Sequence, residues 1–316
     1  MRILKPLIAI LASGYILMYY SEILFWARIR PTDSLSDWLM TWLVYSFLAF
    51  AFLTVISRFR VATLWALFLA GAVFGWLAEG LIVQTAYESL PLSISFTGLA
   101  WHALISVWFG WYAVRRALSA GLGSTMILSA AAGLAYGLWA ISWWLEPDGG
   151  QSPALEFAFF SLLTGLLLAL AYWLYDRSMP ASFTPGRAAQ IAAALPFLLY
   201  FIFVTVPAAP LAAMILPVLF FLVYLALRRN RQIERQAEML FSSRASFPAW
   251  RYLCLLALPV TASLFYASAY ALGLQWRTNW ILYLVTTPAG FVVFIISYIR
   301  ILRRKPHFLD IPRAGM

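Results

Sequence analysis

Charged residues are scarce in this 316-residue chain, and their scarcity decides what class of protein it is. Asp, Glu, Lys and Arg together make up 11% of the residues, whereas hydrophobic residues make up 64%. Because a soluble domain carries about 25% charged residues, the composition excludes a soluble globular protein. The single cysteine, Cys254, excludes an intrachain disulfide and any metal site built from several cysteines.

The chain also lacks the short motifs that mark common enzyme and cofactor sites. It has no phosphate-binding GxxxxGK[ST] loop, no HExxH, no GxSxG and no CxxCH. Its two lysines, Lys5 and Lys305, lie at the ends of the chain, which excludes a retinal Schiff base inside the membrane. With only two histidines, no spacing matches a metal-ligand pattern, so we expect neither a metal nor a cofactor.

What the chain has in quantity is long apolar stretches. A bilayer core about 30 Å thick needs about 20 helical residues to cross it. The sequence predicts an all-α, polytopic membrane helix bundle that forms one integral membrane domain over residues 1–316. About ten transmembrane helices are expected, at residues 6–27, 38–57, 61–85, 97–114, 121–145, 154–175, 188–206, 210–227, 250–272 and 279–300.

Basic residues alternate between the loops in a way that predicts orientation, since cytoplasmic loops carry an excess of Arg and Lys. If the N-terminus is cytoplasmic, the opposite side receives only Arg28, Arg30 and Arg277. We therefore expect both termini in the cytoplasm. The formal net charge of +10 then meets anionic lipid headgroups, and nucleic acid is not an expected partner. Short loops and the lack of an organelle signal favour the plasma (inner) membrane of a prokaryote.

The longest predicted cytoplasmic connection, residues 228–247, mixes arginines with apolar residues. One interpretation is a charged loop that only sets topology. The alternative is a helix on the membrane surface that docks a protein partner.

Interior prolines divide the chain into two halves. Residues 1–175 have none inside a predicted span, whereas each predicted span of residues 188–305 has one, namely Pro196, Pro217, Pro259 and Pro288. Because proline removes a backbone hydrogen bond, the pattern predicts a straighter first half and a kinked second half. The alternative is that these prolines reflect only the ordinary proline content of membrane helices.

Three ionisable side chains lie inside predicted spans, where a charge costs a few kcal/mol unless it has a partner or a function. They are Glu22, Glu79 and His102, on the first, third and fourth spans. At 1.5 Å per helical residue, all three lie roughly 8 Å below the outer boundary. Glu79 is the leading candidate, because Gly75 and Gly80 flank it and allow a backbone or ligand to approach.

The common depth predicts a polar pocket near the extracytoplasmic face. A carboxylate beside an imidazole can orient the ring and exchange a proton with it. Glu79, His102 and Glu22 are the candidate proton-transfer or substrate-binding groups. The candidate substrate-binding residues around them are Gln84, Trp76, Trp101, Trp143 and Trp144.

Three functions fit these patterns. The first is a small transporter, proton-coupled through Glu79 and His102. The second is an intramembrane enzyme that acts on a lipid or lipid-linked substrate at the outer leaflet, with the same residues as acid and base. The third is a non-catalytic assembly protein, in which each polar side chain only hydrogen-bonds a neighbouring helix. The sequence does not identify a substrate.

Overall fold

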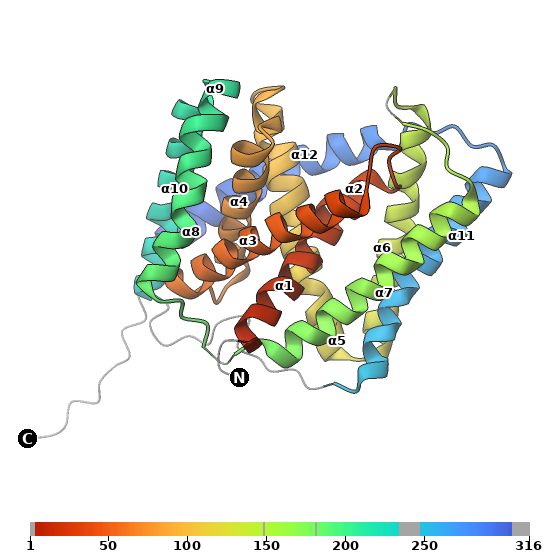
Figure 1. Ribbon diagram of the computed structural model, residues 1–316, viewed down its shortest axis with the longest axis horizontal. Helices are drawn as coiled ribbons and strands as arrows, with labels where there is room; N and C mark the ends of the chain where they lie inside the picture. Colours follow the sequence, from red (N-terminus) through yellow and green to blue (C-terminus); the bar gives the residue numbers. More distant parts are fainter. Residues whose placement is uncertain (1–3, 148, 181, 234–246, 305–316) are drawn as a thin grey trace, which may run out of the picture.

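A computed structural model describes residues 4–147, 149–180, 182–233 and 247–304 of the chain (Figure 1). Every regular element in these ranges is a helix, and nine helices are long and apolar enough to span a membrane. Each of the nine overlaps one predicted span. The prediction of an all-α polytopic membrane bundle is therefore confirmed.

The first half of the chain forms six long helical rods. Several rods change helix type along their length and are built from consecutive α, π or 3-10 segments. In chain order these are α1 Leu4–Met18, η1 Tyr19–Ile23, α2 Leu24–Trp26, α3 Leu35–Phe59, α4 Leu64–Trp76, η2 Leu77–Ile82, η3 Thr85–Tyr87, η4 Ile94–Ala113, α5 Val114–Ala120, α6 Leu122–Ser142, η5 Trp143–Leu145 and α7 Ala154–Ser178.

The second half contributes four further rods. They are α8 Arg187–Tyr200 with η6 Phe201–Thr205 and α9 Val206–Ala208, α10 Ala212–Ile233, η7 Ala249–Leu256 with α11 Ala257–Ala271, and α12 Asn279–Arg303. Pro196, Pro217 and Pro288 lie inside α8, α10 and α12. The division into a straighter first half and a kinked second half stays a prediction.

The predicted loop 228–247 begins as helix, because α10 continues to Ile233. Residues 234–246 lie outside the described residues, so the proposed partner-docking role of this loop stays a prediction.

The fourth predicted span, 97–114, is the one without a counterpart among the nine apolar helices. Its residues form η4 and α5, which carry polar side chains such as His102 and Ser106. Both side chains are buried against other helices. No residue of η4 is exposed, so its polar side chains face protein.

The most buried rods lie in the middle of the bundle. In the most apolar 18-residue stretch of each span, the share of buried residues is 78% for Leu64–Ile82 and 67% for Leu4–Trp26. The same share is 11% for Arg187–Ala208. Figure 1 shows α1 and α4 near the centre, with α6, α7 and α11 on one side and α8 and α10 on the other. Most residues of the central rods are therefore shielded from lipid.

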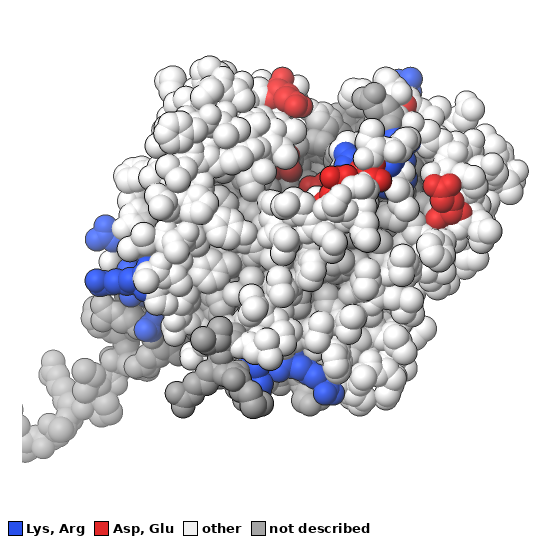
Figure 2. Space-filling model, viewed as in Figure 1, with Lys and Arg blue, Asp and Glu red and all other residues white. Residues whose placement is uncertain are grey.

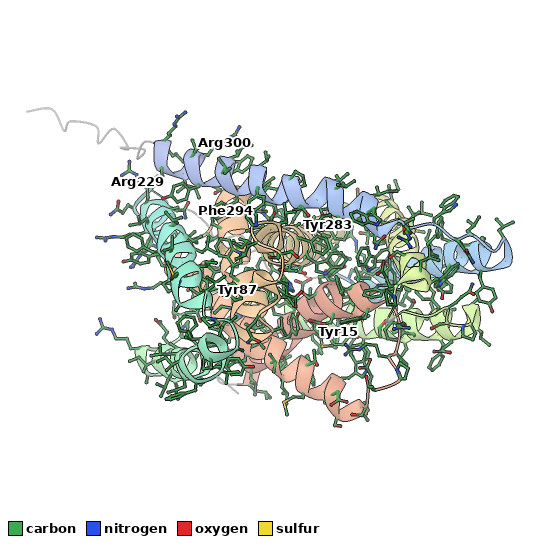
Figure 3. All side chains as sticks on the ribbon, turned by 90° about the horizontal axis from the view of Figure 1, so that it is seen from above. Tyr15, Tyr87, Arg229, Tyr283, Phe294 and Arg300 are labelled. Carbon is green, nitrogen blue, oxygen red and sulfur yellow. The ribbon has the colours of Figure 1, made fainter. Side chains whose placement is uncertain are left out.

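Helix α12 crosses the outside of the bundle obliquely. Seen from above in Figure 3, it extends along one side of the molecule, with Tyr283, Phe294 and Arg300 spaced along it. It packs against η4 and α4, where Ser95 donates a hydrogen bond to the carbonyl oxygen of Thr287 at 2.6 Å. The long helix thereby joins the two flanks of the bundle.

Charge is segregated on the face drawn in Figure 2. Acidic side chains gather toward the upper end, and most of the basic side chains on this face lie at the left and lower edges. The predicted orientation requires a segregation of this kind. Which end faces the cytoplasm stays a prediction.

Candidate functional site

Glu79 and His102 form a hydrogen-bonded pair between two central rods. The His102 Nε2 atom lies 2.7 Å from Glu79 Oε1, across 23 positions of sequence. The His102 side chain is 2% exposed and the Glu79 side chain 13% exposed. The second carboxylate oxygen of Glu79 accepts a hydrogen bond from the Thr85 hydroxyl. A proton held by this pair is therefore reached from the Glu79 end.

The other nitrogen of the His102 ring continues the network inward. Ser21 Oγ on η1 lies 2.9 Å from His102 Nδ1 and 2.8 Å from Ser106 Oγ. The Ser106 hydroxyl also donates to the carbonyl oxygen of Trp101 at 3.2 Å. Both serines are buried. Hydroxyl groups that donate and accept at once can pass a proton along such a chain.

Glycines allow α4 and η4 to approach each other closely. A Cβ atom added to Gly75 on α4 would overlap the carbonyl oxygen of Gly98 on η4. It would also lie 2.9 Å from the Cβ atom of His102. Because Glu79 lies one turn beyond Gly75, this backbone contact sets the distance between Glu79 and His102.

Each predicted ionisable residue lies in a π-helical segment: Glu22 in η1, Glu79 in η2 and His102 in η4. Short π-helical turns within helices are frequent at functional sites. The carbonyl groups at the end of η2 are satisfied by side chains. Thr205 and Gln84 donate to the Leu81 oxygen, and Gln84 donates to the Ile82 oxygen. The π-helical turn η2 is therefore stabilised by the side chains of Thr205 and Gln84.

Just beyond η2, Tyr87 ties the following loop to the helix. Its hydroxyl donates to the Gly80 carbonyl oxygen at 2.8 Å. Burial raises the pKa of Tyr87 to about 12, because the phenolate would lose hydration. The side chain therefore stays a neutral donor at physiological pH.

Glu22 belongs to a neighbouring polar group and does not bond His102. Its carboxylate accepts from the Tyr45 hydroxyl at 2.7 Å and from the Trp26 indole at 3.1 Å. It adjoins the Glu79 network through Ser21, its chain neighbour. The structure thus brings Glu79 and His102 into direct contact and holds Glu22 beside them with its own partners.

Of the five predicted substrate-binding residues, one lines a described cavity and four do not. The Trp76, Trp101 and Trp144 indoles donate to Ile94 O, Ser21 O and the Tyr266 hydroxyl, respectively. Gln84 adopts a left-handed backbone conformation, with a φ of 62°, and caps η2. Trp143 is the one that lines a described cavity.

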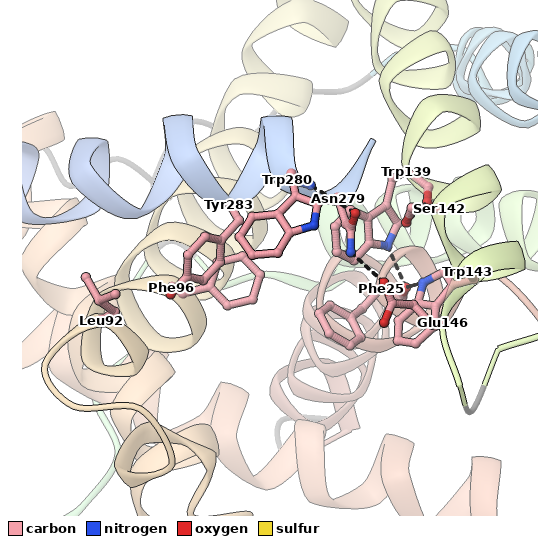
Figure 4. A pocket seen from close by; sticks show the side chains of 10 residues that line it. All are labelled: Phe25, Leu92, Phe96, Trp139, Ser142, Trp143, Glu146, Asn279, Trp280 and Tyr283. Atoms are coloured by element: carbon pink, nitrogen blue, oxygen red, sulfur yellow. Dashed lines mark hydrogen bonds between the residues drawn. The ribbon is translucent and has the colours of Figure 1, made fainter. Parts of the chain in front are cut away.

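This cavity, of about 500 Å³, lies between η4, α6 and α12 (Figure 4). Phe25, Trp139 and Trp143 form one wall, and Phe96, Trp280 and Tyr283 lie across from them. Glu22, Glu79 and His102 do not line it. Trp101 separates the two regions, because its ring centroid lies 4.9 Å from those of Phe25 and Trp139 while its indole N–H bonds Ser21.

The prediction from sequence did not anticipate three partners of the site. Ser106 lies four residues after His102, a spacing that places both on one helix face. Thr85 lies beyond the end of η2, and Tyr45 comes from a different rod. No sequence spacing therefore predicts that these two side chains contact Glu79 and Glu22. Within the described ranges, no three His, Cys, Asp or Glu residues lie close enough together to hold a metal ion.

A second buried polar cluster lies on α5, α7 and η7. Arg115 Nε and Nη2 both lie 2.9 Å from Asp176 Oδ1, and Tyr252 donates to Asp176 Oδ2 at 2.9 Å. The predicted spans 97–114 and 121–145 leave Arg115 in the connection between them. In the fold its side chain is 10% exposed, and through Asp176 the cluster joins three rods.

Comparison with known proteins gives no relative from which a role can be transferred. No family model, no curated protein and no solved structure matches this chain. The chain is a multi-pass helical membrane protein with a buried glutamate–histidine pair, and the inference of function rests on that geometry.

Proposed function

We propose that this protein is a small membrane transporter that couples movement of a solute to protons, and that the Glu79–His102 pair binds the coupling proton. The observation that carries the proposal is the 2.7 Å contact between Glu79 Oε1 and His102 Nε2 inside the bundle. Ionisable residues within membrane spans are costly and mark proton relays in many pumps and transporters. A shared proton neutralises much of that cost while staying exchangeable.

Access supports the same role. The Glu79 side chain, at 13% exposure, is the most exposed of the three, and His102 and Ser21 are both buried. A proton that enters at Glu79 passes to the imidazole, whose second nitrogen faces the Ser21 hydroxyl. The bundle also has nine apolar spans and no described soluble domain, which suits transport.

Proton flux into liposomes tests this proposal. Purified protein is reconstituted around a pH-sensitive dye, and a proton gradient is imposed with a potassium ionophore to clamp the potential. The native protein is expected to carry protons, and the proton flux of Glu79→Gln is expected to be at least tenfold lower. Glu88→Gln is the matched control, because Glu88 is exposed on the loop after η2 and loses the same charge. Equal flux in Glu79→Gln and native protein would overturn the role of Glu79.

A specific observation favours a second candidate, an enzyme that transfers acyl groups. Ser21, His102 and Glu79 follow one another in hydrogen-bonded order, as nucleophile, base and orienting acid do in hydrolases. In such a reaction Ser21 Oγ attacks an ester carbonyl while His102 takes its proton and returns it to the leaving alcohol. Water then releases the acyl group as the acid. Against this candidate stands the burial of the nucleophile, since Ser21 is 3% exposed whereas the Glu79 side chain is 13% exposed.

Labelling with a fluorophosphonate separates the two candidates, because this probe reacts covalently with activated serines. Transport predicts no label on native protein together with a flux that depends on Glu79. The enzyme predicts a label that Ser21→Ala removes and that Ser119→Ala, at an exposed serine, retains. If Glu79-dependent flux and serine labelling are both absent, the remaining expectation is the assembly role.

A further inference from the structure

The cavity between η4, α6 and α12 has one carboxylate, Glu146, among its mostly aromatic lining residues. Glu146, just after η5, accepts a hydrogen bond from Asn279 Nδ2 at 2.7 Å. The Asn279 amide oxygen accepts in turn from the Trp280 backbone N–H at 3.0 Å, so the amide has one fixed orientation. Figure 4 shows this pair beside the indoles of Trp139 and Trp143. The site is therefore built before any ligand arrives.

Glu146 has no ion-pair partner among the residues that the structure describes. Its Oε1 atom is used by Asn279, and its Oε2 atom accepts no hydrogen bond from a described residue. A carboxylate at the rim of an apolar cavity attracts a cation, because the aromatic walls offer no competing hydration.

Six of the ten side chains that line the cavity are aromatic, which favours the same charge. Behind this lining, Trp26 stacks on Trp143 with ring centroids 5.0 Å apart and carries the Arg30 guanidinium 4.4 Å from its own centroid. Across the cavity, the Phe96 and Tyr283 centroids are 4.8 Å apart. The π faces of Trp, Tyr and Phe attract ammonium groups, and Trp does so most strongly.

The polar groups of the cavity disfavour other ligand classes. The indole N–H groups of Trp139 and Trp143 both donate to the Phe25 carbonyl oxygen at 2.6 Å. A sugar would therefore find no donor in these two indoles, and an anion would meet the Glu146 carboxylate. A neutral apolar molecule would desolvate that carboxylate with no compensation. A cation with an apolar body satisfies both the carboxylate and the walls.

We propose that this cavity binds an amphiphilic organic ammonium ion, with Glu146 as the counter-ion and Trp143, Trp280 and Tyr283 against its alkyl and charged surface. The volume of about 500 Å³ suits a small ligand or a lipid amine headgroup. This site is separate from the Glu79–His102 pair, and the proposal does not depend on Glu79 carrying a proton.

Calorimetric titration of the purified protein in a neutral detergent tests the charge requirement. The probes are benzyltrimethylammonium and neopentylbenzene, which has the same shape without the charge. The native protein is expected to bind the cation at least tenfold more tightly than the neutral compound. Equal affinity for the two probes would overturn the proposal.

Two variants assign the effect to this cavity. Glu146→Gln is expected to abolish the tenfold preference, whereas Glu156→Gln keeps it. Glu156 is exposed in the first turn of α7 and loses the same charge. Trp280→Leu changes a side chain that is 54% exposed, so the fold should tolerate it, and it is expected to weaken cation binding about tenfold. A preference that survives in both Glu146→Gln and Trp280→Leu contradicts the assignment.

The same titration in lipid nanodiscs distinguishes the source of the ammonium group. Two kinds of disc with the same fraction of phosphatidylglycerol are compared, one completed with phosphatidylethanolamine and one with an uncharged glycolipid, so that the surface charge is the same. Weaker binding of benzyltrimethylammonium in the discs with phosphatidylethanolamine identifies the lipid amine as the occupant. Equal binding in the two discs identifies a free cation.

Discussion

Gly75 on α4 lies directly against Gly98 on η4, so closely that a methyl group on Gly75 would overlap the Gly98 carbonyl oxygen. This contact between two backbones is the packing feature on which the candidate site depends. It brings the Glu79 turn and the His102 turn to hydrogen-bonding distance and excludes lipid from the seam between them.

Gly75→Ala tests this packing. The added methyl group has to push α4 and η4 apart, and overpacking of this kind costs about 1–3 kcal/mol. We expect a lower unfolding temperature in detergent and a loss of proton flux, because the Glu79–His102 contact lengthens. Gly123→Ala is the control, since no atom lies within 4 Å of the added methyl group there. If Gly75→Ala and Gly123→Ala have the same unfolding temperature and the same proton flux, the contact between α4 and η4 does not determine either quantity.

Ser21→Ala tests whether the imidazole must be held from both sides. The variant removes the partner of His102 Nδ1 and leaves the Glu79 contact in place. We expect proton flux to fall about tenfold, which corresponds to about 1.4 kcal/mol, at the upper end of the range of about 0.5–1.5 kcal/mol for an ordinary hydrogen bond. Ser119→Ala, at an exposed serine, should keep native flux. Full flux in Ser21→Ala would show that the proton path ends at His102.

Asp176→Ala tests the buried cluster on α5, α7 and η7. Removing the carboxylate leaves Arg115 buried without its partner, which costs about 3–5 kcal/mol. Asp33→Ala removes a carboxylate that is 5% exposed, but its partner Arg30 is 39% exposed and stays hydrated, so the loss should be smaller than for Asp176→Ala. Denaturant unfolding in detergent measures both. Equal losses would mean that the Arg115–Asp176 pair is hydrated like a surface pair.

The fold was predictable because the bilayer imposes a length and an apolar composition on each rod. The predicted spans 154–175 and 279–300 agree with α7 and α12 within three residues at every end. The rod at 94–120 shows why composition alone misjudges a span. It is shielded by other rods, so it carries His102 and Ser106 without the apolar surface that lipid requires.

The site was predictable only in part. Equal depth suggested that Glu79 and His102 meet, but depth does not specify rotation about a helix axis. Rotation decides that Glu22 pairs with Tyr45 while its neighbour Ser21 reaches His102. The Glu146–Asn279 pair joins positions 133 residues apart at the ends of two rods, and no local pattern marks such a contact.

Infrared difference spectra between low and high pH, recorded on reconstituted protein, test most directly whether Glu79 binds and releases the proton. The account predicts a carboxyl stretching band that is absent from Glu79→Gln, retained in Glu88→Gln and displaced in His102→Asn, because the imidazole is the hydrogen-bond partner of that carboxyl group. If the Glu79→Gln spectrum is identical to the native one, Glu79 does not exchange a proton and the central claim is wrong.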